Sequence, residues 1–221
     1  SGLLAAGFSA AAEGKPERIV CVATVHREES DSIFLTESSA FRTPLGEIPV
    51  DIGGGEQLMG YTTIIVKNDI PHLEEHSIEV LLPYLQTVFP GTPFLPILLG
   101  KNSSAIARVL ATAFTGAFGR PSDNTLFIIS SSLARNSTPE KARESAEKLV
   151  SLTDRGDAES ILKAHERKEI SACGTAGIAG LVTYLGEAYR AELHGMNAAH
   201  PELDGKGETI QFGSIAFHRK D

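Results

Sequence analysis

The 221-residue sequence contains only two cysteines, Cys21 and Cys173, and they lie far apart. Two such cysteines do not build the disulfide framework of a small secreted protein, so the cytoplasm is the expected location. Basic residues are also few, because 20 Lys and Arg stand against 28 Asp and Glu, which gives a net charge of −8. Nucleic acid and anionic membrane surfaces bind clustered Lys and Arg, so the sequence argues against both as main partners.

Long apolar runs are missing as well. No stretch approaches the roughly twenty residues of a membrane-spanning helix, and no signal-peptide pattern opens the chain. What is present is an ordinary globular composition, with 42% apolar and 22% charged residues. A chain of this length and composition can bury a full core in one domain. No internal repeat or linker interrupts it.

Continuous apolar runs alternate with amphipathic segments along the chain. Runs of this kind are typical of buried, parallel strands, whereas apolar residues at helical spacing indicate helices. The pattern predicts buried strands at 18–25, 93–100 and 125–132, shorter strands within 33–50, and a closing strand at 208–218. It predicts helices at 1–13, 103–118, 138–152, 157–167 and 174–194, and a Gly-rich turn at the start of 51–61. The prediction is one α/β domain with a mostly parallel or mixed sheet flanked by helices.

The segment His72–Pro90 begins with acidic residues and histidines and continues as an apolar stripe at helical spacing. Pro83 lies inside the stripe and should kink the helix or restart it at its first turn. Glu75 and His76 precede the stripe. Either they cap the helix, because acidic groups suit a helix start, or His76 faces the same pocket as His26.

Chemically active side chains follow several of the predicted strands, and ligands of open α/β sheets usually lie at such strand ends. His26 follows the first buried run, Gly100 and Lys101 follow the second, and the sequence SSSLARNS, residues 130–137, follows the third. His26 is either a site residue or a histidine whose hydrogen bonds are satisfied by loop backbone.

Cys173 lies where a Gly-rich helix is predicted to begin. A helix N-terminus lowers the pKa of a thiol and favours the thiolate as a nucleophile or metal ligand. The alternative is a small buried hydrophobic residue, as most free cysteines are. Cys21 lies inside a strand and is expected in the core. Gly174, Gly177 and Gly180 do not match a phosphate-binding loop, so they indicate close helix packing.

These pieces together resemble the Memo family, including the Memo-like proteins of AmmeMemoRadiSam systems. The resemblance covers most of the chain in the right order, and its most specific part is the EHS-E motif within residues 74–86. The start of the chain looks like the segment that follows the family's Pro-His-Ala-Gly-Tyr motif. The other stretches that carry the resemblance are FRTPLGEIPVD (41–51), FLPILLG (94–100), FIISSS (127–132) and ISACGTAGI (170–178).

The resemblance implies a fold shared with class III extradiol dioxygenases, which hold non-haem iron with two His and a Glu. It also implies that His26 and Cys173 occupy two metal-ligand positions of the family. His76 is a candidate third ligand, with Glu75 beside it in the pocket. The family's first His would lie upstream of Ser1, so residues 1–221 are expected to form a Memo-like domain that lacks its N-terminal segment.

The chain departs from the family pattern at three pocket positions. Ser132 and Arg135 stand where the family has Asp and His, and Arg27 stands where a second His often follows the first. A guanidinium with a pKa above about 12 cannot serve as an acid/base group at neutral pH. The resemblance therefore implies a degenerate metal pocket and argues against a competent dioxygenase.

Three functions stay open at this point. An iron- or copper-dependent redox enzyme would need a further ligand to complete the site. A binding module for a small molecule, an anion or a phosphopeptide could use Arg27 and Arg135, since Arg pairs with carboxylate and phosphate. The alternative for each Arg is a simple pair with an acidic side chain. A structural role in a larger assembly is the third, and the sequence does not indicate the oligomeric state.

Overall fold

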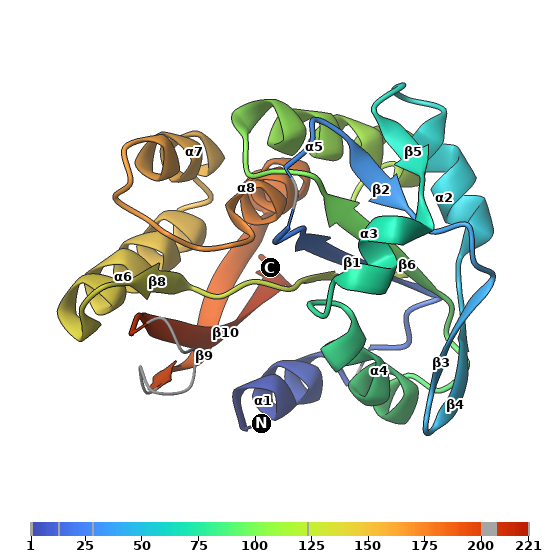
Figure 1. Cartoon of the computed structure of the whole chain (residues 1–221), viewed down its shortest axis with the longest axis horizontal. Coiled ribbons are helices and arrows are strands. Elements are labelled where there is room, and N and C mark those ends of the chain that lie inside the picture. The colour runs from blue at the N-terminus through green and yellow to red at the C-terminus, as the bar shows by residue number, and fades with distance from the viewer. Residues whose placement is uncertain (1, 13, 28, 123, 200–206, 221) are drawn as a thin grey trace.

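A five-stranded sheet forms the centre of the fold (Figure 1). Its order is β5 (Ile65–Lys67), β2 (Ile33–Leu35), β6 (Phe94–Leu99), β1 (Arg18–Thr24) and β7 (Thr125–Ile129). β6, β1 and β7 are parallel, whereas β2 runs antiparallel to β6. This computed structural model describes residues 2–12, 14–27, 29–122, 124–199 and 207–220. The predicted α/β domain with a mixed sheet is confirmed.

Helices cover both faces of the sheet (Figure 1). Val20 and Val22 of β1 belong to a core shared with α5 (Ser104–Phe118) and α8 (Thr175–Leu185). Ile19 and Cys21, on the opposite face of the same strand, pack with α1 (Gly2–Ala11) and α4 (Leu82–Val88). A strand in the middle of such a sandwich is buried on both faces, which explains its continuous apolar run. Cys21 is fully buried, as expected.

Several of the predicted helices begin at a side chain that caps their first turn. Ser103 caps α5 by accepting a hydrogen bond from the backbone N–H of Ile106. Thr138 caps α6 (Pro139–Asp154), and Asp157 caps α7 (Ala158–Glu166). Each cap satisfies one of the backbone donors that the first turn leaves unpaired. The predicted positions of these helices are therefore confirmed.

The predicted Gly-rich turn at residue 51 is wrong. Residues Ile52–Met59 form the helix α2, and Asp51 caps it by accepting from the backbone N–H of Gly54 at 2.9 Å. Gly55 lies against Leu35 and Leu95 of the sheet. The cap and this close packing outweigh the low intrinsic helix propensity of glycine.

The helix predicted at 174–194 is too long. α8 ends at Leu185, where Gly186 takes a left-handed φ of 63°, and a short 3₁₀ turn (Gly186–Ala188) follows. β9 (Tyr189–Ala199) then pairs antiparallel with β10 (Thr209–Arg219), the predicted closing strand. β8 (Ala134–Asn136) completes a second sheet in the order β8-β10-β9.

The third predicted buried strand is correct in position but not in burial. β7 is an edge strand of the central sheet, and each of its residues is only partly buried. It ends at Ile129, so Ser130, Ser131 and Ser132 follow the strand and do not belong to it. The short-strand signals within 33–50 correspond to β2 and to a hairpin of β3 (Ala40–Thr43) and β4 (Gly46–Pro49).

The segment His72–Pro90 is not one helix. It contains the end of α3 (Asp69–Glu74), a 3₁₀ turn (Glu79–Leu81) and α4, and Glu75 between them is extended. Pro83 lies in the first turn of α4, so the helix restarts there as one of the two alternatives predicts. Because Glu75 is extended, the chain leaves the helix there, and the EHS motif lies at the carboxyl ends of β1 and β7.

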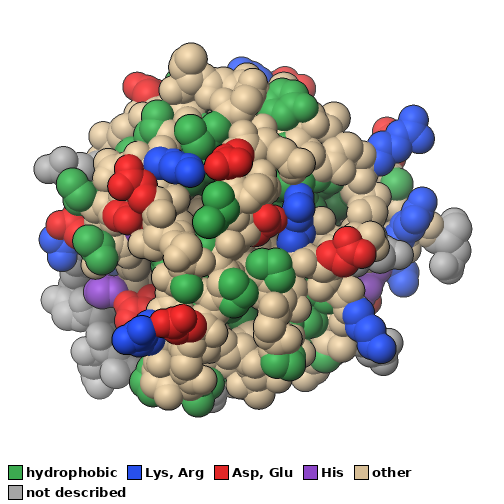
Figure 2. Space-filling model, turned by 90° about the vertical axis from the view of Figure 1, so that its right-hand side faces the viewer, with side chains coloured by type: hydrophobic (Ala, Val, Ile, Leu, Met, Phe, Trp, Pro, Cys, Tyr) green, Lys and Arg blue, Asp and Glu red, His purple; other side chains and the backbone are tan. Residues whose placement is uncertain are grey.

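The surface carries charges of both signs. On the face drawn in Figure 2, Lys and Arg are interspersed with Asp and Glu among neutral side chains. No described helix has the length and apolar character needed to cross a membrane.

A cavity of about 440 Å³ lies near Arg18, Asp51 and Phe118, at the amino end of β1. It is far from the carboxyl ends of the strands.

Candidate metal and thiolate site

The carboxyl ends of β6, β1 and β7 lie side by side, because the three strands are parallel neighbours. His26 follows β1, Asn102 follows β6 and Ser132 follows β7. Cys173 lies two residues before the first residue of α8. The residues that the sequence places after these strands therefore lie close together at the carboxyl end of the sheet, where open α/β sheets usually bind ligands.

Glu75 binds His26 at two points. Its Oε2 accepts from the backbone N–H of His26 at 3.0 Å and lies 2.9 Å from the ring Nδ1. A carboxylate can only accept at this distance, so Nδ1 carries the proton. The Glu75 side chain is 10% exposed, whereas that of His26 is 50% exposed. The buried carboxylate of Glu75 thus fixes one side of the imidazole, and the rest of the ring is accessible to solvent.

The second carboxylate oxygen of Glu75 accepts hydrogen bonds from the two residues that follow it in the chain. Oε1 accepts from the backbone N–H groups of His76 and Ser77, both at 3.1 Å, and from the Ser77 hydroxyl. The main chain therefore wraps around the carboxylate instead of continuing as a helix. Ser130 fastens this loop to the sheet by donating its hydroxyl to the Ser77 carbonyl at 2.7 Å.

Cys173 lies next to Ser132, shortly after the end of β7. Its Sγ accepts from the backbone N–H of Ser132 at 3.1 Å, and the side chain of His26 lies close enough to lower the pKa of the thiol. The Ser131 hydroxyl lies 3.7 Å from the same sulfur and accepts from the backbone N–H of Gly174 at 2.8 Å. Because Nδ1 of His26 faces Glu75, Nε2 is the ring nitrogen available to the thiol. Glu75, His26 and Cys173 thus form a continuous chain.

The approach of Cys173 to the serines requires glycine at the next position. A Cβ on Gly174 would lie 2.7 Å from the Cβ of Ser131, closer than side chains pack. A Cβ on Gly177 would lie 3.1 Å from Ile129. The close packing predicted for these glycines is confirmed, and it presses the start of α8 against the strand ends.

Asn102 is a site residue that sequence reasoning missed. Its Nδ2 donates to the Cys173 carbonyl at 2.6 Å, and its Oδ1 accepts from the backbone N–H of Ala176 at 2.9 Å. Its place directly after a buried strand was the only available signal.

Glu75, His26 and Cys173 shift one another's pKa values in the direction that favours the charged forms. Hydrogen bonds to Cys173 and to Glu75 raise the pKa of His26 to about 10 against the opposing effect of burial. Burial would raise the pKa of Cys173, but hydrogen bonds from His26 and Ser132 lower it to about 7. Burial likewise opposes ionisation of Glu75, yet His26 and Ser77 lower its pKa to about 2. Near neutral pH the site therefore holds carboxylate, imidazolium and a partly formed thiolate.

The remaining predicted pocket residues lie apart from this chain. The His76 side chain is 78% exposed and pairs with Glu79 at 3.0 Å, so the structure does not bring it to His26 or Cys173. Its ring turns outward because Glu75 takes the backbone N–H of His76. Arg27 faces Glu74 at 3.5 Å, and Arg135 faces Glu208 at 3.4 Å.

The donor types of the pair fit a transition metal. Imidazole and thiolate together suit copper, iron and zinc, and a carboxylate on the far ring nitrogen is the usual support of a metal-bound His. The number of ligands is smaller than such sites normally have. Within the part of the chain that the structure describes, no third His, Cys, Asp or Glu joins His26 and Cys173 at ligand spacing.

Comparison with known proteins identifies the family. The model of a family described as "Memo-like protein" matches residues 1–198. The chain belongs to the Memo-like family. A MEMO1 family protein of Thermotoga neapolitana is 28% identical over 213 residues, which is 96% of this chain and 75% of that protein. One from Aeropyrum pernix is 30% identical over 169 residues, 76% of this chain and 60% of that protein.

The match covers every residue of the site described above. The matched residues include the EHS segment, the serine run after β7 and Cys173. The chain spans 60% of the Aeropyrum protein, and 58% of another MEMO1 family protein from Sulfurisphaera tokodaii.

Proposed function

We propose that His26 and Cys173 hold a single iron or copper ion and that the described residues do not perform ring-cleaving oxygenation. The observation that carries the proposal is the position of His26 between Glu75 and Cys173. One ring nitrogen is fixed by a carboxylate, and the other meets a thiol of lowered pKa. This is how proteins prepare an imidazole and a thiolate to bind a metal.

Each residue would have a distinct part in this site. Glu75 fixes the ring orientation of His26 and keeps the proton on Nδ1, which leaves Nε2 as the ligand nitrogen. The Ser132 N–H and the start of α8 stabilise the Cys173 thiolate. Metal binding would displace the proton that His26 shares with Cys173, so affinity should increase with pH.

The metal would supply redox chemistry and open coordination positions for oxygen or a small molecule. The described residues do not supply the acid/base group that ring cleavage also needs. Arg135 occupies the family's His position in sequence, but it faces Glu208, and a guanidinium has donors and no acceptor. A second acid/base residue or a further ligand would have to come from elsewhere for an enzyme to result.

Less supports the alternative of an anion- or phosphopeptide-binding module. Arg27 and Arg135 face Glu74 and Glu208, respectively, so a carboxylate already stands where an anion would bind. They also flank different elements, the end of β1 and β8. Simple pairing, the alternative weighed from the sequence, accounts for both side chains.

Competition for Cu(I) against a chromogenic chelator tests the proposal. We expect about one equivalent for the wild-type chain and a loss of at least about tenfold in affinity for Cys173→Ser and for His26→Gln, since even outer residues of metal sites contribute that much. His76→Ala is the matched control, because it removes an exposed histidine away from the site. Equal affinity in all four proteins would refute the proposal.

A further inference from the structure

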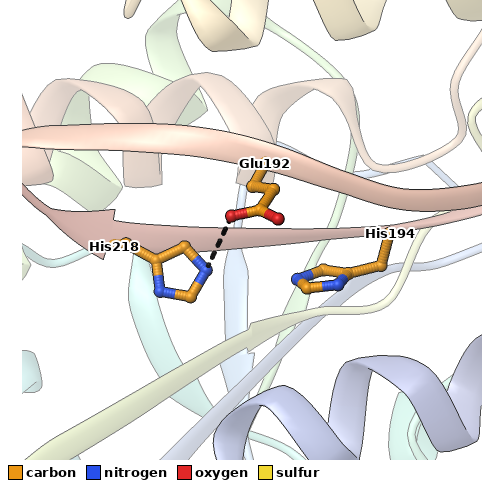
Figure 3. A group of neighbouring side chains, drawn as sticks. All are labelled: Glu192, His194 and His218. Atoms are coloured by element: carbon orange, nitrogen blue, oxygen red, sulfur yellow. Dashed lines mark ion pairs between the residues drawn. The ribbon is translucent and has the colours of Figure 1, made fainter.

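A second group of metal-ligating side chains lies on the C-terminal strand pair. Glu192 and His194 come from β9 and His218 comes from β10 (Figure 3). One ligand atom from each lies within 4.8 Å of the other two, and no other group of three meets this spacing among the described residues. The group contains no cysteine and shares no residue with the His26–Cys173 site.

The strand geometry explains why the three side chains meet. Glu192 and His194 are two residues apart, so a strand presents them on the same face. His218 pairs in register with Arg190, which makes it the diagonal neighbour of Glu192 across the ladder. The register shifts between Ser214 and Ile215, and a bulge of this kind re-aims the side chains beside it.

The Nε2 atom of His218 is shielded from solvent and makes no hydrogen bond to the described atoms. The nearest carboxylate oxygen, Oε2 of Glu192, is 3.7 Å away. That separation is too long for a hydrogen bond. It is close to the roughly 3.4 Å between two ligands that each lie about 2.1 Å from a tetrahedral metal ion.

The two rings also leave room for a shared ion. The centroids of His194 and His218 are 6.3 Å apart with the planes at 63°, so the rings do not stack on each other. In Figure 3 the carboxylate of Glu192 lies between the two imidazoles. Three donors from two strands thus lie around one point, and one of them, Nε2 of His218, is in ion-pair range of Glu192 but makes no hydrogen bond.

We propose that Glu192, His194 and His218 bind one divalent transition-metal ion of the Zn²⁺ type. Two imidazoles and a carboxylate suit zinc, cobalt and nickel better than calcium or magnesium, which prefer oxygen ligands. The absence of a thiolate from this donor set separates the site from one for Cu(I). Three protein ligands leave a fourth position for water, as in open zinc sites.

Such an ion would fasten β9 to β10. β9 is an edge strand of its sheet, and β10 is the one strand that it pairs with among the described residues. A metal that binds the native state and not the unfolded one adds stability by mass action. Glu192 and His194 are exposed, so the ion can enter directly from solvent.

Co²⁺ binding to a chain that carries Cys173→Ser and His26→Gln tests the proposal independently of the first site. We expect a visible tetrahedral Co²⁺ spectrum without thiolate charge-transfer bands, and a rise in melting temperature with Zn²⁺. Adding His194→Ala, His218→Gln or Glu192→Gln should each weaken Co²⁺ binding by at least about tenfold, since even outer residues of metal sites contribute that much. His76→Ala is the matched control, because His76 and Glu79 form an exposed histidine–carboxylate pair with no second imidazole.

Unchanged Co²⁺ affinity in all three ligand variants would overturn the proposal, and so would the absence of any Co²⁺ spectrum in the parent protein. A measurement on the unaltered ligands guards against variants that fail to fold. Histidine NMR signals of the parent protein should show large paramagnetic shifts for His194 and His218 and none for His76. Equal shifts for all three would mean only non-specific binding and would also overturn it.

Discussion

Glu75 holds His26 by both its backbone N–H and its ring Nδ1, at 3.0 and 2.9 Å, across 49 residues of sequence. The same carboxylate gathers the two backbone N–H groups that follow it. Glu75 is therefore a positioning residue. It fixes where the imidazole points, and through the imidazole it sets the charge on Cys173.

Replacement of Glu75 by Gln should raise the pKa of the Cys173 thiol above about 7, because the carboxylate that favours the His26 cation is lost. The thiolate fraction at pH 7 should fall about threefold if the contact is worth about 1 kcal/mol. The rate of iodoacetamide alkylation as a function of pH measures this. Cys21 does not interfere, because burial raises its pKa to about 12.

Glu79→Gln is the control for this experiment. Glu79 also pairs with a histidine, His76, but both side chains are largely exposed and lie apart from Cys173. Its pH–rate profile should match that of the wild type. Identical profiles for Glu75→Gln and the wild type would contradict the proposed coupling.

Stability should depend on pH through the same pair. His26 has its pKa raised from 6.5 to about 10, so its contribution is fully present below about pH 6.5 and is lost as the pH rises through 10. Glu75 has its pKa lowered from 4.5 to about 2, so its contribution is present above about pH 4.5 and is lost as the pH falls through 2. The contact between them stabilises the fold most between pH 4.5 and 6.5.

Urea unfolding of the wild type and of Glu75→Gln at a series of pH values measures this window. The difference in free energy of unfolding between the two proteins should be largest near pH 5 to 6 and shrink on either side, as the charged pair is lost. A difference that keeps rising above pH 8 would contradict the assignment of the raised pKa to His26.

Replacement of Gly174 by Ala should destabilise the protein by roughly 1 to 3 kcal/mol, the usual cost of overpacking. The added Cβ would lie 2.7 Å from the Cβ of Ser131 and would force apart the serine loop and the start of α8. The Cys173 thiolate loses donors in the process, so its pKa should also rise. Urea unfolding and the alkylation profile measure the two effects.

Gly53→Ala is the matched control, because it places the same methyl group in the first turn of a helix at an exposed position. The nearest atom, Oδ1 of Asp51, would be 3.8 Å away, which is an ordinary contact. This variant should be stabilised by up to about 1 kcal/mol, the difference in helix propensity between Gly and Ala. Gly174→Ala as stable as the wild type would refute the close-packing account.

The sequence predicts those elements whose causes are local. β1 and β6 are readable because their apolar runs reflect burial on both faces, and α5 and α6 because Ser103 and Thr138 cap them. His26 and Cys173 were recognisable from the strand end and the helix start beside them, together with the family resemblance. Each of these signals lies within a few residues of the feature that it indicates.

The rest depends on contacts between distant residues. The helix ends before Glu75 because the Glu75 carboxylate binds His26, which is 49 residues earlier in the sequence. Asn102 acquires its role from Cys173, 71 residues away. The Glu192–His194 pair was hidden because its segment reads as part of a helix, and only a strand places the two side chains on one face.

X-ray absorption at the metal edge of the loaded protein tests the central claim most directly. The chain would carry His194→Ala, so that only the His26–Cys173 site takes up the ion, and one equivalent of Cu(I) would be added. We expect one sulfur ligand at about 2.3 Å together with nitrogen, and the loss of the sulfur shell in Cys173→Ser. A coordination shell of nitrogen and oxygen alone, unchanged by Cys173→Ser, would contradict the account.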